Sequence, residues 1–479
     1  MGGPRLNNPE GVEVVGDLAI VLHSHMPYVE GYGTYPFGEE WLFDAVVRSH
    51  LPVAAVARNL TLTVTPVLAD QLESPPVIER LRGFCDDHRV GAACLDREDV
   101  PAEYRAAVDL EISRYRRSLA ALRHFDGPLD AFREAASARG VELIASAASH
   151  AVLPLLASNQ GKRLQIDAGL RSHRRRFGAC EGFWLPECAY DSGLESLLAE
   201  FGVERFCIDQ TAVMADGDAL RPIATAAGPV AMAIDWPTVD LVWSWEGYPS
   251  FRGYADFHRI SGRGMRIFAI DGGPYDPAAA AQRAVEQADE FLAAVAARLA
   301  RHREAAGEGG LIVFAADTEL FGHWWSEGPV WLETVLARAG AAGIGLCTLS
   351  EAAAAHRAVE RPLVRSSWGA DKSLATWDSR EVAEIAWAAR RLELAVLRAA
   401  GAGAVSAAAL QRAARELVMV QSSDWAFLDK TSQAGDYGFE RATQHCEAAF
   451  EALRGNVASP RLRNLAPDLS LAPLISPAP

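Results

Sequence analysis

The feature that most constrains the fold is a series of short apolar runs, each followed at once by polar residues. The runs occupy residues 18–22, 60–68, 141–146, 182–185, 205–208, 239–243, 311–315 and 344–348. Stretches with the alanine-rich composition of helices separate several of them, for example 277–306 and 330–340. Strands that alternate with helices in this way are typical of α/β proteins. The sequence therefore predicts a parallel sheet of about seven or eight strands.

The position of the polar residues favours a barrel over an open sheet. Polar clusters follow many of the runs rather than one or two of them. In a parallel barrel the C-terminal ends of all strands meet at one face, which gathers such clusters into a single site. We therefore predict an α/β barrel with its functional groups at that face.

Two regions interrupt the alternation of strands and helices. Residues from about 73 to 140 are charged and helical, which predicts an insert on the rim of the barrel. We predict a barrel domain over 1–355 that includes this insert, followed by a helical C-terminal domain over 361–457. The proline-rich tail, residues 458–479, is expected to lack regular structure.

Composition limits the classes of function. The chain has 479 residues, half of them apolar, which is enough for a large catalytic domain and a smaller one. Its net charge of −16 argues against nucleic acid or an anionic membrane as a partner and suits a neutral substrate. Seven cysteines without a Cys-x-x-Cys pair are typical of reduced thiols. With no leader-like N-terminus and no stretch that spans a membrane, we expect a cytoplasmic protein, and the oligomeric state stays open.

Two acidic residues follow strand-like runs beside tryptophans and form the candidate catalytic pair. Glu187 comes directly after Trp184-Leu-Pro, and Asp317 stands between a buried run and Trp324. Carboxylates supply acid and base groups and indole faces stack on sugar rings, so the pair predicts a glycoside-processing site. In a retaining mechanism the two carboxyl groups lie about 5–5.5 Å apart. The apolar residues before Asp317 favour its protonated form. Ordinary acids at strand ends are the plain alternative.

Four histidines are candidates for the same site. His23 and His25 lie on one face at the end of the first predicted strand, and His150 and His323 follow later runs. The His-x-His spacing is compatible with a metal site and equally with hydrogen bonds to sugar hydroxyls. A structural role in the core is the third reading, and the residues alone leave the three open.

Two further residues lie beside a candidate acid or in a segment that we expect to cover the barrel mouth. Tyr248 lies between glycine and proline, and we expect it to lean over a bound sugar and exclude water, although a packed aromatic turn accounts for the segment as well. Cys188 adjoins Glu187 but has no evident base beside it. We interpret Cys188 as a small buried residue rather than a nucleophile.

Together these segments resemble glycoside hydrolase family 57 and, within it, the bacterial branching-enzyme subgroup. The likeness runs in order through nearly the whole chain, in blocks that begin at Leu22, Glu142, Trp184 and Asp317. Ser-Ser-Trp368-Gly and Ser-Ser-Asp424-Trp425 resemble the helical C-terminal domain of the subgroup. The blocks around the two acids are long and specific.

The resemblance implies an incomplete (β/α)7 barrel followed by the helical domain, and no metal or other cofactor in catalysis. Glu187 would be the nucleophile and Asp317 the acid/base of a retaining transfer on an α-glucan such as amylose or glycogen. The transfer would cleave an α-1,4 bond and join the chain to a 6-hydroxyl, forming an α-1,6 branch. The implied substrate contacts are His23, His25, His150, Trp184, Tyr248, His323, Trp324, Trp368, Asp424 and Trp425.

The chain departs from the subgroup just after Tyr248. Branching members usually carry Gly-Tyr-Pro-Gly-Asp there, whereas this chain reads Gly-Tyr-Pro-Ser-Phe-Arg. Branching requires that a sugar rather than water completes the second step, so an α-glucan hydrolase or a 4-α-glucanotransferase stays open. A metal-dependent deacetylase with His23 and His25 as ligands and a non-catalytic glucan-binding protein are further alternatives.

Overall fold

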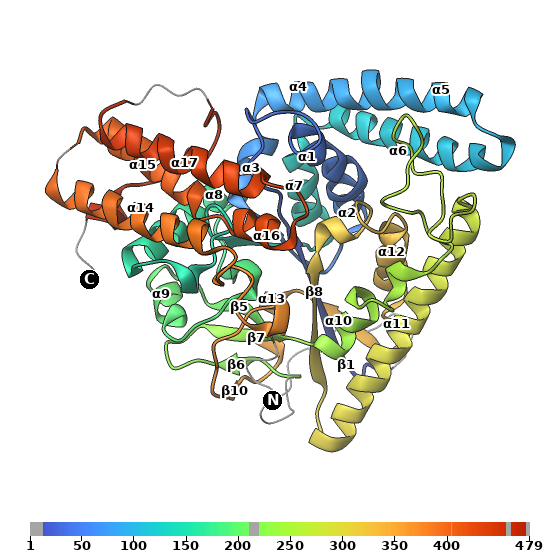
Figure 1. The fold of residues 1–479 in the computed structure, drawn as a ribbon. Coiled ribbons are helices and arrows are strands. Elements are labelled where there is room, and N and C mark those ends of the chain that lie inside the picture. Colours follow the sequence, from blue (N-terminus) through green and yellow to red (C-terminus); the bar gives the residue numbers. More distant parts are fainter. Residues whose placement is uncertain (1–12, 210–219, 404, 457–460, 476–479) are drawn as a thin grey trace.

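The computed structural model describes residues 13–209, 220–403, 405–456 and 461–475, and its centre is a curved parallel sheet (Figure 1). Seven parallel strands of this described part follow in the order β7-β5-β4-β3-β2-β1-β8. The backbone N–H of Asp235, just after β7, donates to the carbonyl of Val313 on β8 at 2.9 Å, so the two ends of the sheet approach each other. The strands are β1 (Gly16–Ser24), β2 (Thr61–Val64), β3 (Glu142–Ser146), β4 (Gly182–Trp184), β5 (Arg205–Asp209), β7 (Val230–Ile234) and β8 (Gly310–Asp317). The predicted incomplete seven-stranded barrel is confirmed.

Three short strands extend this sheet. β9 (Ile344–Cys347) pairs in parallel with the first half of β1, whereas β2 pairs with its second half. β6 (Ile223–Ala224) lies antiparallel to β7 and parallel to β10 (Val359–Glu360). Because β8 pairs with β1 along its whole length, β1 is held on both sides from end to end.

One strand prediction is wrong, and one barrel strand, β7, was missed together with the two-residue strands β6 and β10. Residues 239–243 belong to helix α10 (Trp236–Trp243), and the sixth barrel strand is β7. A five-residue segment with four apolar residues, interrupted only by Asp240, fits a strand and a buried helix face equally well. Pro237 decides the matter, because proline near the first position of a helix favours helix initiation. The strand within 60–68 is likewise shorter than predicted, because α3 (Pro66–Leu72) begins at a proline.

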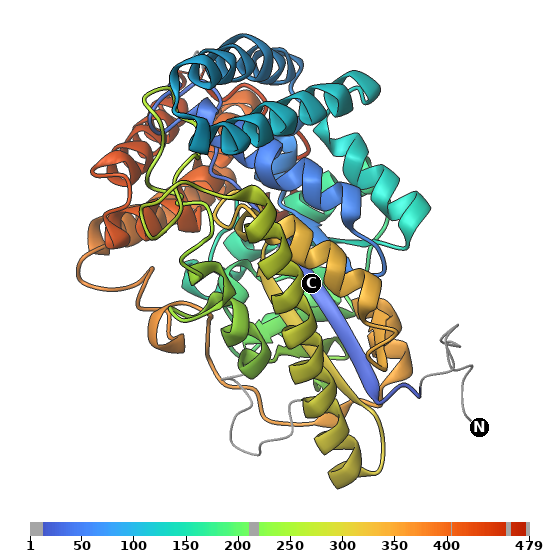
Figure 2. The same cartoon turned by 90° about the vertical axis from the view of Figure 1, so that its right-hand side faces the viewer.

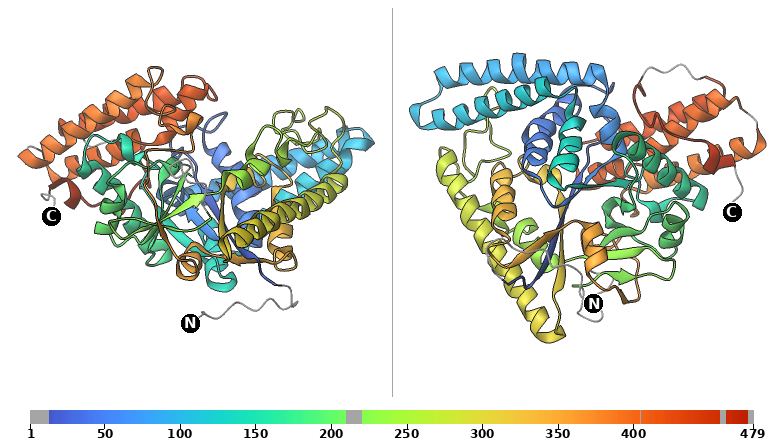
Figure 3. Two further views of the ribbon diagram at one scale, coloured as in Figure 1. Left: turned by 90° about the horizontal axis from the view of Figure 1, so that it is seen from below. Right: turned by 180° about the vertical axis from the view of Figure 1, so that it is seen from behind.

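Helices cover the outside of the barrel and form two groups beside it. The barrel helices are α1 (Glu39–Ala45), α2 (Leu51–Val56), α3, α8 (Asn159–Phe177), α9 (Leu194–Glu200), α10, α11 (Pro277–Ala306), α12 (Gly328–Arg338) and α13 (Leu349–Ala355). The first group is α4 (Pro75–Gly83), α5 (Gly91–Asp99), α6 (Arg105–His124) and α7 (Pro128–Arg139). The second is α14 (Ala383–Ala402), α15 (Ala407–Val420), α16 (Ser423–Thr431), α17 (Tyr437–Leu453) and α18 (Ala472–Ile475). Figures 1 and 3 show the two groups on opposite sides of the barrel, and Figure 2 shows α11 running along its flank.

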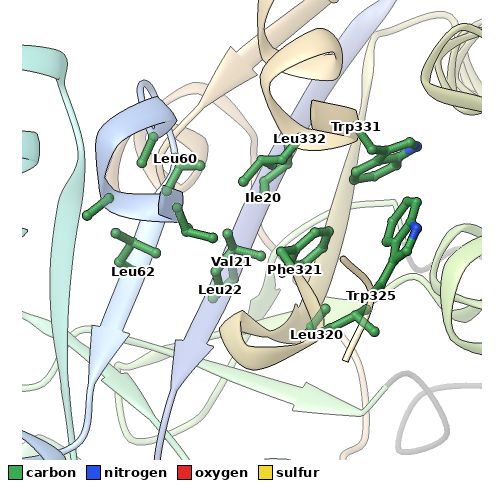
Figure 4. Packing of buried hydrophobic residues seen from close by; sticks show 14 of the residues in the cluster. Ile20, Val21, Leu22, Leu60, Leu62, Leu320, Phe321, Trp325, Trp331 and Leu332 are labelled. Carbon is green, nitrogen blue, oxygen red and sulfur yellow. The ribbon is translucent and has the colours of Figure 1, made fainter. Parts of the chain in front are cut away.

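The main core fills the barrel and the space below its outer helices. Ile20 and Leu22 of β1 belong to the same apolar cluster as Leu62 of β2 (Figure 4). Beyond β8, the ring centroids of Trp325 and Trp331 lie 5.7 Å apart. Strands buried on both faces read as continuous apolar runs, which explains why β1 and β8 were recognisable in the sequence. This core supports the segment that leads from Asp317 to Trp325.

A second core joins the C-terminal helices to the barrel. Leu417, Trp425 and other apolar residues of α15 to α17 pack against Tyr28, Val67 and Leu164 of the barrel. Residues 461–471 of the predicted tail contain no helix or strand, as expected, although Leu465 is completely buried in this core; only α18 (Ala472–Ile475) is regular. The rest of the predicted tail, 458–460 and 476–479, lies outside the described residues. None of the helices in the described part is long and apolar enough to cross a membrane.

Candidate active site

A cavity of about 680 Å³ opens at the C-terminal ends of the barrel strands. Its wall combines residues from the ends of β1, β4 and β8 with residues from the helical C-terminal region. Nine of the predicted site residues line it: His23, His25, His150, Glu187, Asp317, His323, Trp324, Trp368 and Asp424. Segments separated by up to 400 residues are therefore brought to one face, as a barrel requires.

Glu187 is held by a strained turn and a tryptophan. It lies in the single turn Pro186–Cys188 after β4 with φ 60° and ψ 20°, and Cys188 also has a positive φ of 47°. Such conformations cost about 1–3 kcal/mol each and persist where surrounding contacts enforce them. The indole Nε1 of Trp368 donates to Glu187 Oε2 at 2.9 Å, and the Trp368 backbone N–H donates to the Glu187 carbonyl at 3.0 Å. The carboxylate is thus fixed in direction.

The pKa values of the two candidate acids are both raised. Burial raises the pKa of Glu187, while hydrogen bonds from Trp368 and Ser423 and the nearby His25 oppose the increase. Burial raises the pKa of Asp317 well above its ordinary value, and the charges of Glu319 and Glu187 raise it further. The upward shift is the larger one for Asp317, so the protonated form is favoured on Asp317 and Glu187 is the more readily ionised of the two.

His23 and His150 form a chain of hydrogen bonds below the acids. The Nε2 atoms of the two rings lie 2.8 Å apart, and His23 Nδ1 lies 2.5 Å from Thr63 Oγ1. His150 Nδ1 lies 2.8 Å from Ser423 Oγ and 3.5 Å from Glu187 Oε1. Burial lowers the pKa of both histidines well below the ordinary value, and the neighbouring His25 lowers it further. Both rings are neutral at physiological pH.

His25 differs from its two neighbours, because its pKa is raised rather than lowered. Its Nε2 lies 2.9 Å from Asp424 Oδ1, and its Nδ1 lies 3.0 Å from Thr65 Oγ1. Burial alone would lower the pKa of His25, but Asp424, Glu319 and Glu187 outweigh burial and raise it. The helical C-terminal region therefore contributes, through Asp424, to the charge balance around Glu187.

The histidine geometry does not support the metal-site interpretation. The rings of His25 and His150 are stacked with centroids 4.0 Å apart, and those of His23 and His150 with centroids 4.7 Å apart. Within the described ranges, no group of three or more His, Cys, Asp or Glu side chains is arranged to hold a metal ion.

His323 and Trp324 form the opposite side of the cavity. His323 Nδ1 lies 3.3 Å from Asp44 Oδ2, and Arg266 donates to the His323 carbonyl at 2.6 Å. The ring of Trp324 is 40% exposed and lies 4.6 Å from that of Phe257. Trp324 thus offers an indole face to the cavity mouth, where a sugar ring is able to stack on it.

Three predicted substrate contacts lie outside the cavity wall. Trp184 is completely buried and stacks beneath His23, with ring centroids 4.8 Å apart. Trp425 is also completely buried, and its indole donates to the Met419 carbonyl in the C-terminal core. The ring of Tyr248 is half-buried and lies 6.4 Å from that of Trp331. In this structure these side chains support the wall rather than face its interior.

Several cavity residues were not predicted. Trp236 is the most informative, because its Nε1 donates to Asp209 Oδ2 at 2.6 Å and Lys372 Nζ lies 2.8 Å from its ring centroid. The available signal was the Asp-Trp-Pro sequence directly after the missed strand β7. Glu319 accepts a hydrogen bond from the His25 backbone N–H at 3.0 Å. Trp41, Trp243 and Trp377 also line the cavity.

The site combines two buried carboxyl groups, of which Asp317 has the more strongly raised pKa, with many indole rings in one cavity. Glu187 can attack a carbon centre, Asp317 can donate a proton, and tryptophans can hold sugar rings between them. These are the groups that a retaining enzyme acting on glycosides requires.

Comparison with known proteins assigns the chain to a family. The model of glycosyl hydrolase family 57 matches residues 19–364, and the model of the C-terminal domain of 1,4-alpha-glucan branching enzymes matches residues 384–466. The protein belongs to glycosyl hydrolase family 57.

Individual relatives agree with this assignment. The chain is 32% identical to the 1,4-alpha-glucan branching enzyme of Thermococcus kodakarensis, over 90% of this chain and 72% of that protein. It superimposes on the branching enzyme structure from Pyrococcus horikoshii with a TM-score of 0.90 at 30% identity, covering 97% and 98% of the two chains. The alpha-amylase AmyC of Thermotoga maritima gives a TM-score of 0.84 at 25% identity, covering 97% and 99%.

Proposed function

We propose that this protein is a 1,4-α-glucan branching enzyme. It cleaves an α-1,4 bond of a glucan chain, holds the chain on Glu187 and transfers it to a 6-hydroxyl. The observation that carries the proposal is the pair Glu187 and Asp317 in one tryptophan-lined cavity, together with the branching-enzyme C-terminal domain matched over 384–466. The named relatives that are branching enzymes support the same activity.

In the first step Asp317 acts as acid and Glu187 as nucleophile. Asp317 holds its proton because burial and the charges of Glu319 and Glu187 raise its pKa. It protonates the glycosidic oxygen while the Glu187 carboxylate attacks the anomeric carbon. The bond to the departing sugar breaks as the bond to Glu187 forms, so the chain remains on the enzyme as a glycosyl ester.

In the second step the roles of Asp317 reverse. Its carboxylate accepts the proton of an acceptor 6-hydroxyl, the acceptor oxygen attacks the anomeric carbon, and Glu187 leaves as a carboxylate. Transfer exceeds hydrolysis only where sugar occupies the cavity in place of water. Trp324 and Trp368 are placed to hold that sugar, and His25, His323 and Asp424 supply polar groups to the wall.

The helical C-terminal region forms part of the working site in this proposal. Ser423 and Asp424 of α16 reach His150 and His25 of the barrel. We divide the chain into a barrel with a helical insert, residues 1–355, and a helical domain, residues 361–457, and place the protein in the cytoplasm. All seven cysteines are free thiols, which suits a reducing compartment.

The test is the ratio of new α-1,6 linkages to new reducing ends on amylose. A branching enzyme gives a ratio well above one, because each cleaved bond is replaced by a branch. Glu187→Gln should abolish both products while keeping the fold, since the amide retains the hydrogen bond from Trp368. A ratio well above one that survives in the variant would exclude Glu187 as the nucleophile.

An α-glucan hydrolase or 4-α-glucanotransferase is the second candidate. Two observations favour it: Tyr248 packs on Trp331 instead of the cavity, and the alpha-amylase of Thermotoga maritima has a similar fold over nearly the whole chain. In the same assay a hydrolase releases many reducing ends with few α-1,6 linkages. A glucanotransferase redistributes chain lengths without either product.

A further inference from the structure

Helix α10 forms part of one cavity wall and carries a tryptophan at each of its ends. Trp236, Val239 and Trp243 of α10 all line the cavity. They are three and four residues apart, so they share one face of the helix and span about 10 Å along it. The helix therefore presents one indole at its start and another at its end.

The two ends of α10 differ in how their indoles are held. Trp236 is fixed by Asp209 and Lys372 inside the cavity. Trp243 is 46% exposed, and Trp245, two residues further on, is 99% exposed. Across the described stretches of the chain, neither exposed indole makes a hydrogen bond or ring contact with another residue. Both rings are available to a ligand.

Three of the exposed aromatic side chains line the cavity. A single exposed apolar residue is ordinary on a protein surface, whereas a cluster marks a binding site. Trp243, Trp324 and Phe427 are between 37% and 46% exposed, and all three line the cavity. Trp245 follows Trp243 by two residues in the chain and lies outside the cavity wall.

The turn that carries Trp245 is tightly packed. The Gly247 N–H donates to the Ser244 carbonyl at 2.9 Å, which closes the turn directly after α10. A Cβ at position 247 would lie 2.5 Å from the Val242 carbonyl oxygen, so only glycine permits this close approach. Trp245 is therefore presented by a fixed backbone, as a stacking surface requires.

We propose that Trp243 and Trp245 form an outer subsite that binds the α-glucan chain where it leaves the cavity. This subsite rests on the proposed α-glucan substrate. The apolar C–H face of a glucosyl ring stacks on an indole without any charge, which suits a neutral polymer and a site that offers only indole faces. Chains long enough to reach Trp245 gain this contact, and short chains do not.

Two substitutions at matched exposed tryptophans test the subsite. Trp245→Ala should raise the KM for amylose about 3- to 10-fold, the range expected for one aromatic stacking contact. Its kcat on amylose and its kinetics on maltotetraose should match those of the parent protein. Trp387→Ala is the control, because Trp387 is 61% exposed on α14 and is not part of the cavity wall. This control should leave all three quantities unchanged.

A binding assay separates this subsite from the proposed function. Amylopectin in a native gel should retard the parent protein and the Trp387 variant, and should retard Trp245→Ala less. Equal retardation of all three proteins, or an equal change of KM on amylose and maltotetraose, would overturn the subsite. A third outcome would also overturn the subsite: Trp245→Ala alone sediments as a smaller species while its retardation is unchanged. Trp245 would then join two copies of the chain instead of binding glucan. If the parent protein forms no α-1,6 products, the branching proposal is refuted. The subsite proposal still stands in that case, provided that Trp245→Ala weakens the retardation by amylopectin.

Discussion

Replacing Glu111 with glutamine tests how firmly the helical insert is joined to the barrel beside the site. Glu111 of α6 accepts hydrogen bonds from Arg48 Nη1 and Nη2 at 2.9 and 2.5 Å, and both side chains are only 2% exposed. Arg48 also contacts Asp44 at 2.8 Å, and Asp44 in turn lies beside His323 in the cavity wall. The ion pair thus links the insert to the site.

The size of the effect follows from the pKa of Glu111. Burial would raise this pKa, but Arg48 and Arg114 lower it from 4.5 to about 2. The difference corresponds to about 3 kcal/mol of unfolding free energy at neutral pH. Because the pKa is lower in the folded state, this stability is present above about pH 4.5 and is lost as the pH falls toward 2. Loss of one partner from a buried ion pair lowers the free energy of unfolding by about 3–5 kcal/mol, which agrees with the value from the pKa of Glu111.

Urea unfolding followed by tryptophan fluorescence measures this difference. Glu111→Gln should lose about 3 kcal/mol at pH 7 and progressively less as the pH is lowered below 4.5. Asp109→Asn on the same helix is the control, because its ion pair with Arg97 is nearly half exposed on both sides and is worth at most about 1 kcal/mol. Equal losses in the two variants at pH 7, or a loss in Glu111→Gln that does not depend on pH, would refute the reasoning.

Three further predictions concern the acids of the cavity. Glu319→Gln removes a charge that raises the pKa of Asp317, so the alkaline limb of the kcat/KM profile should move to lower pH; an unmoved limb would exclude Asp317 as the acid. Trp368→Phe removes a hydrogen bond that lowers the pKa of Glu187, so the acid limb of the same profile should move to higher pH. Cys188 is buried and burial raises the pKa of its thiol, so Cys188→Ala should keep most activity and thiol reagents should inactivate neither protein. Rapid inactivation of the parent protein alone would contradict the last expectation.

The barrel strands next to the acids were the most predictable part of the fold. β1 and β8 are buried on both faces, so their sequences are continuous apolar runs that end abruptly in polar residues. β7 and α10 were not distinguished in this way, because an apolar segment of only about five residues is too short to show a period of two or of 3.6. A local pattern identifies an element only when the element is long enough to show its period.

The cavity was predictable in its acids and only partly in its aromatic residues. Asp424 and Trp425 are neighbours on α16, and neighbouring positions on a helix face different directions. Asp424 therefore points into the cavity and Trp425 into the core, a distinction that a motif of adjacent residues does not contain. The hydroxyl partners of His23 and His25, Thr63 and Thr65, lie 40 residues further along the chain and follow only from the pairing of β1 with β2.

In the hydrogen bond between His23 and His150, behind Glu187, the donor and the acceptor ring are determined by their neighbours. Two Nε2 atoms at 2.8 Å share one proton, so one neutral ring must donate and the other accept. An ionised Glu187 only accepts, which orients the Ser423 hydroxyl toward it and leaves the Ser423 oxygen to accept from His150 Nδ1–H. His150 Nε2 then accepts from His23, and His23 Nδ1 accepts from Thr63. The charge of the Glu187 carboxylate is thereby coupled to the tautomers of two histidine rings, one of them on β1.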